Sequence, residues 1–308
     1  MNRIMKKTTA AVLSVAMLAS SAAALNQSGV QNGLAITASA ANDLPPGTVW
    51  WGEIGGVYYW EYPTYVTAVG CTDDAVNITI QENIHNKPVT GIDFSSNFAN
   101  KPALKTVTIN AKIQHLSANI FENDTNLTSV YLPNTLQTIG QSAFAGCSKL
   151  EKFDIPYATN SVGYGALAGC TKLKKIIAHG NTSFNSNVFK NFYTGAVTSF
   201  TGKFYCYTGT RPATFALNKG YNRVFYKMGD VNFNNIIDAT DASQILGFYA
   251  SLSTGGNLPA AQREKMEICA DVTRDGRINA IDASAVLSYY AAISTGYTYS
   301  FEYFMANR

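Results

Sequence analysis

The 308-residue sequence is poor in cysteine, proline and charge. It has only five cysteines (Cys71, Cys147, Cys170, Cys206 and Cys269), and this odd, sparse set is a poor framework for a disulfide-stapled fold. A formal net charge of +3 and 14% charged residues give no global basic field, so composition does not suggest a nucleic-acid partner. With 46% hydrophobic residues, the chain is expected to fold as one large domain or two modest ones.

Past its start, the sequence also lacks a hydrophobic run that could span a membrane. The first segment, MNRIMKKTTAAVLSVAMLASSAAAL, places three basic residues before a short apolar stretch. About 16 apolar or small residues fall short of the ~20 that cross a bilayer, which argues against a membrane anchor. Residues 1–40 are therefore predicted to be a signal peptide, cleaved after Ala38-Ser39-Ala40 or, alternatively, after Ala22-Ala23-Ala24.

Leucines recur at a fixed spacing through the middle of the chain. Leu104, Leu127, Leu150 and Leu173 are each separated by 23 residues, and the unit is clearest over 127–149. A unit of this length cannot bury its apolar side alone, so successive coils stack, with equivalent residues in ladders about 4.8 Å apart. This period predicts a solenoid of mixed short strands and helical turns.

The segment from Leu132 to Cys147 resembles the L-P-x-x-L-x-x-I-G-x-x-A-F-x-G-C signature of BspA-like leucine-rich repeats. Gly140 and Gly146 are expected to permit tight turns, and the third copy departs from the signature at Thr159 and Leu167. The resemblance implies a leucine-rich repeat domain over residues 43–227. Residues 57–70 and 76–92 are expected to form an N-terminal strand cap, and residues 204–226 a closing strand and helix.

The predicted strands carry outward-facing residues between their buried positions. These are Thr106, Thr108, Ser129, Tyr131, Lys152, Asp154, Lys175 and Ile177. We expect this face to bind a protein or a glycan. Between Ile155 and Tyr226 the chain has eight Lys or Arg and no Asp or Glu, which favours an acidic partner unless the run is simply a solvated face.

After Tyr226 the pattern changes to two 12-residue segments, 230–241 and 271–282, that align without a gap. Oxygen-bearing side chains fall at positions 1, 3, 5, 9 and 12, the spacing of an EF-hand-like calcium loop in which position 7 contributes its backbone carbonyl. The predicted ligands of two calcium ions are Asp230, Asn232, Asn234, Ile236, Asp238, Asp241, Asp271, Thr273, Asp275, Arg277, Asn279 and Asp282.

Two departures from the loop pattern bear on the predicted calcium sites. Asn235 stands at position 6 of the first loop, and asparagine tolerates the left-handed backbone that the turn needs. Thr273 replaces the usual Asn or Asp at position 3 of the second loop, which weakens that site. Two polar turns that merely cap helices are the alternative interpretation.

Each loop leads into an apolar helical stretch, ASQILGFYA after the first and ASAVLSYYAA after the second. This duplicated loop and helix resembles a type I dockerin, similar to those of Ruminococcus cellulosomes, and implies a small all-α dockerin module over residues 228–308. The resemblance implies a cohesin domain of a scaffoldin as the partner. The implied contact residues are Ala239, Thr240, Leu246, Gly247, Ala280, Ile281, Leu287 and Ser288.

Together these features predict a secreted, extracellular protein associated with a cellulosome or the cell surface. The dockerin would bind cohesin when loaded with calcium, and the repeat domain would bind a protein or glycan. In the alternatives, the repeat region is a divergent enzyme acting on plant cell-wall polysaccharide, or an inert spacer. We predict no enzyme, because the acids form no motif for paired carboxylates.

A cysteine nucleophile is disfavoured for a different reason. His85, His115 or His179 could serve as its base on paper. Cys147 and Cys170, however, occupy equivalent repeat positions that are expected to face inward, where buried thiols are inert.

Overall fold

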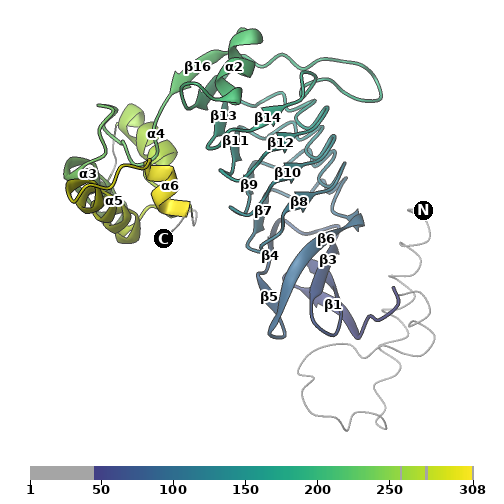
Figure 1. The fold of residues 1–308 in the computed structure, drawn as a ribbon. Coiled ribbons are helices and arrows are strands. Elements are labelled where there is room, and N and C mark those ends of the chain that lie inside the picture. Colours follow the sequence, from purple (N-terminus) through teal and green to yellow (C-terminus); the bar gives the residue numbers. More distant parts are fainter. Residues whose placement is uncertain (1–44, 257–258, 275–276, 307–308) are drawn as a thin grey trace.

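The computed structural model describes residues 45–256, 259–274 and 277–306. The predicted signal peptide (1–40) and the predicted start of the repeat domain at residue 43 lie outside the described residues. Figure 1 shows an elongated solenoid with a cluster of helices beside its C-terminal coils. None of the helices in the described ranges is both long and apolar enough to cross a membrane.

A five-stranded sheet covers the N-terminal end of the solenoid. Its order is β1 (Trp50–Ile54), β2 (Val57–Glu61), β3 (Val66–Cys71), β6 (Lys87–Asn97) and β5 (Asn83–Ile84). The prediction of a strand cap is right for this sheet. It is wrong for β4 (Asn77–Ile80), which pairs in parallel with the first repeat strand because its buried Ile78 and Ile80 continue the ladder of Val107 and Ile109.

Parallel strands of successive coils form one side of the solenoid. β4, β7 (Thr106–Ile109) and β9 (Ser129–Tyr131) make one sheet, and β11 (Lys152–Ile155), β13 (Lys175–Ala178), β15 (Lys203–Cys206) and β16 (Asn222–Phe225) make the next. A second row of two-residue strands comprises β8 (His115–Leu116), β10 (Thr138–Ile139), β12 (Ser161–Val162) and β14 (Ser183–Phe184). The repeat prediction is thereby confirmed in its register, since Lys152 pairs with Lys175.

Apolar ladders between the strand rows form the core. Leu104, Leu127 and Leu150 are fully buried, and the rings of Phe98, Phe121 and Phe144 follow one another at 5.7 and 5.4 Å. Each such side chain contributes about 1.5–3 kcal/mol on burial. The core therefore grows one layer with each added coil.

Polar groups within the ladders are bonded to the preceding coil. Thr159, which replaces a leucine, is buried, and its hydroxyl donates to the carbonyl of Leu136 at 2.9 Å. The thiol of Cys147 donates to the carbonyl of Phe121 at 3.2 Å, and all five cysteines are free and buried. The expectation of inward-facing, unbridged thiols is therefore confirmed.

The two glycines of the repeat signature are required for different structural reasons. Gly146 has φ +79° and so occupies the left-handed region expected for a turn. Gly140 is needed for close approach instead, because an added Cβ would lie 2.6 Å from the backbone carbon of Ser117.

The C-terminal end of the solenoid is closed by β15, α2 (Arg211–Asn218) and β16, as the sequence predicted. The following module contains α3 (Ala239–Ser253), α4 (Ala260–Cys269), α5 (Ala280–Ser294) and α6 (Phe301–Ala306). α3 and α5 pack against each other, whereas α4 and α6 lie between them and the solenoid (Figure 1). A solenoid followed by a small all-α module confirms the predicted fold class.

One ladder position carries an acid. Asp124 is fully buried at the place that Cys147 and Cys170 occupy in later coils. One carboxyl oxygen accepts from the amide of Lys101 at 2.7 Å, and the other has no hydrogen-bond partner in the part of the chain that the structure describes. Burial raises the pKa of Asp124 from 3.8 to about 7. The folded state thus holds a proton that the unfolded chain releases.

We predict that the free energy of unfolding of the solenoid decreases as the pH rises from about 4 to about 7. The raised pKa of Asp124 limits this loss to at most about 4 kcal/mol. Urea denaturation at pH 5 and pH 8 would measure it, with Asp124→Asn as the variant that cannot ionise. An equal pH dependence in the variant would contradict the assignment.

Candidate functional site

The first predicted calcium loop, residues 230–241, is closed by hydrogen bonds from its own backbone. One carboxylate oxygen of Asp241 accepts from the amide of Val231 at 3.0 Å, and the other accepts from the amide of Asp238 at 3.0 Å. Asp230 accepts from the amides of Asn234 and Asn235 at 3.1 and 2.9 Å. These bonds draw the first and last residues of the loop to the same place.

Two asparagine side chains of this loop form short-range turns with the backbone two residues ahead. Asn232 accepts from the amide of Asn234 at 2.8 Å, and Asn234 accepts from the amide of Ile236 at 2.7 Å. The predicted left-handed conformation of Asn235 is confirmed by its φ of +69°. Phe233 has φ +63°, so the chain bends twice within the loop.

The second loop repeats this construction. One oxygen of Asp282 accepts from the amide of Thr273 at 3.0 Å, and the other accepts from the amide of Asn279 at 2.9 Å. The hydroxyl of Thr273 also donates to Asp282, at 2.8 Å. Arg274 has φ +59°, matching Phe233 of the first loop. Of the remaining predicted ligands, Asp271 and Arg277 are described and Asp275 lies outside the described residues.

The donor set of these loops suits a hard cation such as calcium. Carboxylates that accept one or two amide bonds keep further lone pairs, and carboxylate, amide and carbonyl oxygens are the ligands of calcium. Among the described residues, no three His, Cys, Asp or Glu side chains gather as a metal cluster. The predicted coordination depends instead on Asn232 and Asn234 as well as on acids.

Each loop is rigidly joined to the helix after it. Asp238 and Asp241 form a capping box at the start of α3, and Asn279 and Asp282 form the equivalent box at the start of α5. Capping satisfies helix amides that would otherwise lack partners. Burial raises the pKa of Asp241, with Asp230 nearby adding to the effect. A carboxylate whose ionisation is disfavoured by burial and by a nearby acid favours a bound cation.

The predicted partner residues lie on the exposed sides of α3 and α5. Leu246 is 41% exposed, Leu287 is 42% exposed and Ile281 is 60% exposed, so each helix offers apolar area to a partner. Ser288 is half-buried, and the other predicted contacts are exposed: Ala239, Thr240, Gly247 and Ala280.

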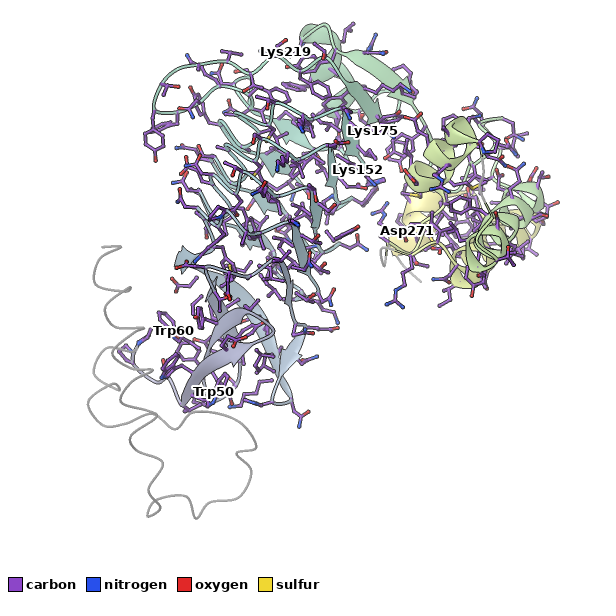
Figure 2. All side chains as sticks on the ribbon, turned by 180° about the vertical axis from the view of Figure 1, so that it is seen from behind. Trp50, Trp60, Lys152, Lys175, Lys219 and Asp271 are labelled. Atoms are coloured by element: carbon purple, nitrogen blue, oxygen red, sulfur yellow. The ribbon has the colours of Figure 1, made fainter. Side chains whose placement is uncertain are left out.

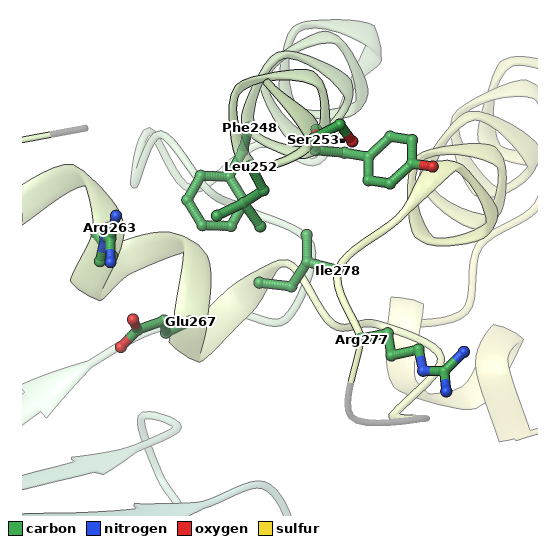
Figure 3. Close-up of a pocket in the computed structure, with 8 residues that line it drawn as sticks. Phe248, Leu252, Ser253, Arg263, Glu267, Arg277 and Ile278 are labelled. Carbon is green, nitrogen blue, oxygen red and sulfur yellow. Dashed lines mark hydrogen bonds between the residues drawn. The ribbon is translucent and has the colours of Figure 1, made fainter. Parts of the chain in front are cut away.

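A groove of about 490 Å³ lies at the C-terminal end of α3. Phe248 and Leu252 of that helix form its apolar side with Ile278, and Arg263, Glu267 and Arg277 lie around it (Figure 3). Ile278 follows Arg277, the predicted backbone ligand of the second loop, so the groove borders that loop.

The predicted ligand face of the solenoid is open at its N-terminal strands and covered at its C-terminal strands. Tyr131 is 51% exposed, and Thr106, Thr108 and Ser129 are half-buried, so the N-terminal strands present an open face. Ile177 is fully buried in the same apolar cluster as Met228 and Ile268, so the prediction that it faces an external ligand is wrong. The helical module covers this part of the sheet, a long-range contact that the repeat pattern does not reveal.

The three candidate catalytic histidines have structural partners. Nδ1 of His85 lies 2.7 Å from Glu61, and Nδ1 of His115 lies 2.9 Å from the hydroxyl of Thr138. Nε2 of the buried His179 lies 2.6 Å from Asp154. Burial raises the pKa of the Cys170 thiol to about 12, so its reactive thiolate is disfavoured.

The fold and loops define a repeat solenoid joined to a module with two EF-hand-like loops. Residues 76–201 match the BspA type leucine rich repeat region in six copies, and residues 228–290 match the dockerin type I domain. The chain thus combines these two families in the order that the sequence predicted. Dockerin type I domains are calcium-binding modules whose partners are cohesins, and neither domain type is catalytic.

Solved structures similar to this chain include other leucine-rich repeat proteins. The T. pallidum protein TpLRR is 15% identical, with a TM-score of 0.45, over 70% of this chain and 94% of its own. Pneumococcal antigen PcpA is 17% identical, with a TM-score of 0.43, over 59% of this chain and 48% of its own. A Bacteroides ovatus protein is 16% identical, with a TM-score of 0.36, over 50% and 47%. No curated protein sequence matches the chain.

We predict that Asp230→Ala combined with Asp271→Ala abolishes calcium binding by the chain. Both residues stand at position 1, and Asp230 also fixes the loop backbone through two amides. Calorimetry should find two ions per chain before the change and none after it, with a loss of helical circular dichroism like that caused by a chelator. Asp74→Ala, an exposed acid of the cap region, is the control. Undiminished calcium uptake by the double variant would refute the ligand assignment.

Proposed function

We propose that the chain is a secreted, non-catalytic component of a cellulosome-type assembly. Its dockerin domain, with two bound calcium ions, docks on a cohesin domain of a scaffoldin, and its repeat domain binds an extracellular protein or glycan. The observation that carries the proposal is the pair of capped calcium-type loops, each leading into a helix with an exposed apolar face.

Calcium binding to the two loops would stabilise α3 and α5, the helices proposed to contact cohesin. Calcium would bind to Asp230, Asp241 and their equivalents, and Asp241 and Asp282 also lie in the first turns of α3 and α5, where they complete the capping boxes. Because each carboxylate joins a loop to a helix, loss of the ion would loosen the start of the helix. Cohesin binding would therefore depend on calcium.

The two helices offer nearly equivalent surfaces for cohesin. Leu246 matches Leu287 in sequence position and in exposure, which supports two binding orientations related by a half-turn. The match fails at Thr240 and Ile281, because Ile281 presents more apolar area. Burying Ile281 in place of Thr240 favours one orientation by about 1–2 kcal/mol, or roughly tenfold in affinity.

An insertion loop is the best-placed region of the solenoid for a ligand. The strand register advances by 28 residues from Lys175 to Lys203, instead of 23, and the added chain includes Phe192, Tyr193 and Val197. These side chains are 54%, 68% and 71% exposed. Insertions in solenoids commonly form binding loops, and exposed rings offer stacking surfaces to a sugar or an apolar side chain.

We predict that Leu246→Asp or Leu287→Asp alone weakens cohesin binding modestly, whereas both changes together nearly abolish it. Each charge blocks one of two equivalent apolar faces. Calorimetry with a panel of purified cohesin domains in calcium would measure the affinities, and Thr254→Asp, beyond α3, provides a control at an exposed position. Complete loss from one single variant and none from the other would show a single binding mode.

We predict that Phe192→Ala with Tyr193→Ala removes binding of the chain to its ligand on protein or plant cell-wall glycan arrays, without changing thermal stability. Both rings are largely exposed, so their removal leaves the core intact. Tyr249→Ala, on the dockerin, is the aromatic control. An array without any ligand would favour the spacer alternative, and release of reducing sugar from the glycans would favour the enzyme alternative.

A further inference from the structure

A row of lysines on the solenoid faces one acid of the dockerin. Lys152, Lys175 and Lys203 stand beside one another because their strands pair in register. The ammonium groups of Lys175 and Lys203 each lie 3.3 Å from the carboxylate of Glu264 on α4. The hydroxyl of Tyr205 donates to the same carboxylate. These contacts hold the pKa of Glu264 below its usual range, with the Tyr205 hydrogen bond as the main cause.

A second contact joins the solenoid to the chain just after Thr273. The guanidinium of Arg274 lies over the ring of Tyr157, 4.9 Å from its centroid. The carbonyl of Arg274 accepts from the side-chain amide of Asn134 at 3.4 Å. Arg274 has the left-handed backbone of the loop bend, so the solenoid holds the loop where its conformation is strained.

Between these polar contacts the two domains share one apolar core. Ile177, Tyr205 and Tyr226 of the solenoid belong to the same buried cluster as Ile268, Val272 and Phe301. A module of this size buries too little surface to be very stable alone. The solenoid therefore supplies part of the dockerin's core. Figure 2 shows Lys152 and Lys175 on the side of the solenoid that faces the helices.

The strand surface beneath the dockerin is itself held rigid. The hydroxyl of Tyr226 lies 2.7 Å from Nδ1 of His179, whose Nε2 lies 2.6 Å from Asp154. Burial opposes ionisation of Asp154, yet His179 and Lys152 beside it hold its pKa well below its usual range. This network ties β11 to the residues that directly follow β13 and β16, beneath the interface.

We propose that the C-terminal part of the solenoid sheet is a docking surface for this chain's own dockerin domain. The two domains form one rigid unit in solution, and α3 and α5 keep their exposed faces free for a partner. Docking and calcium binding strengthen each other, because the solenoid holds Arg274 in the conformation that the loop needs. By linkage, whatever docking adds to calcium affinity, calcium adds equally to docking.

The test combines Lys175→Glu with Lys203→Glu in the chain from residue 41 onward, which lacks only the predicted signal peptide. These changes leave the dockerin sequence intact and repel Glu264. In small-angle X-ray scattering with calcium, the unchanged chain should be compact and the variant should have a larger maximum dimension. Calorimetric calcium affinity should fall about fivefold. The two added glutamates would by themselves attract calcium and raise its affinity. A decrease in calcium affinity therefore reports the loss of docking.

Lys105→Glu with Lys219→Glu reverses two exposed lysines outside these contacts and should change neither quantity. Adding Glu264→Lys to the interface variant should restore compactness by reversing both sides of the ion pairs. The proposal would be overturned if scattering from the unchanged, calcium-loaded chain fitted only two domains that move freely. That result would leave the calcium and cohesin assignments standing. Compact scattering and unaltered calcium affinity in the interface variant would also overturn it.

Discussion

The stacking of one incomplete coil on the next is the constraint on which this molecule depends. A coil of 23 residues exposes an apolar layer on each side, and only a neighbouring coil in register can cover it. Leu104, Leu127 and Leu150 meet in this way, and polar groups such as Thr159 are accommodated by bonding to the coil before them. A stack of this kind always leaves two ends to be covered.

The two ends are covered by different means. At the start, a five-stranded sheet closes the stack, and β4, which lies between β3 and β5 in the sequence, pairs in parallel with β7 as part of the stack. At the far end, α2 and β16 complete the last coil. The side of the final sheet then meets the dockerin, whose own core is completed by Ile177, Tyr205 and Tyr226. The dockerin and the last strands of the solenoid thus bury each other's apolar side chains.

This arrangement also divides the surfaces by function. The dockerin uses α4 and α6 toward the solenoid, so the apolar sides of α3 and α5 remain exposed. On the solenoid, the strand face near Tyr131 and the insertion loop with Tyr193 stay open, whereas Lys175 and Lys203 are paired with Glu264. An internal partner therefore occupies the most basic part of the strand face, and an external ligand would need another surface.

The sequence by itself determined the elements that repeat. Leucine spacing predicted the coils and their register, and paired loop motifs predicted the order of loop and helix, the bend at Asn235 and the exposed sides of α3 and α5. Such features arise from contacts at fixed sequence separations, which a periodic pattern records. Tertiary structure alone decided that Ile177 is buried, that Glu264 meets Lys175 and Lys203, and that Arg274 lies on Tyr157. These residues are about 60 to 120 positions apart and belong to no repeat, so only the packing of complete domains brings them together.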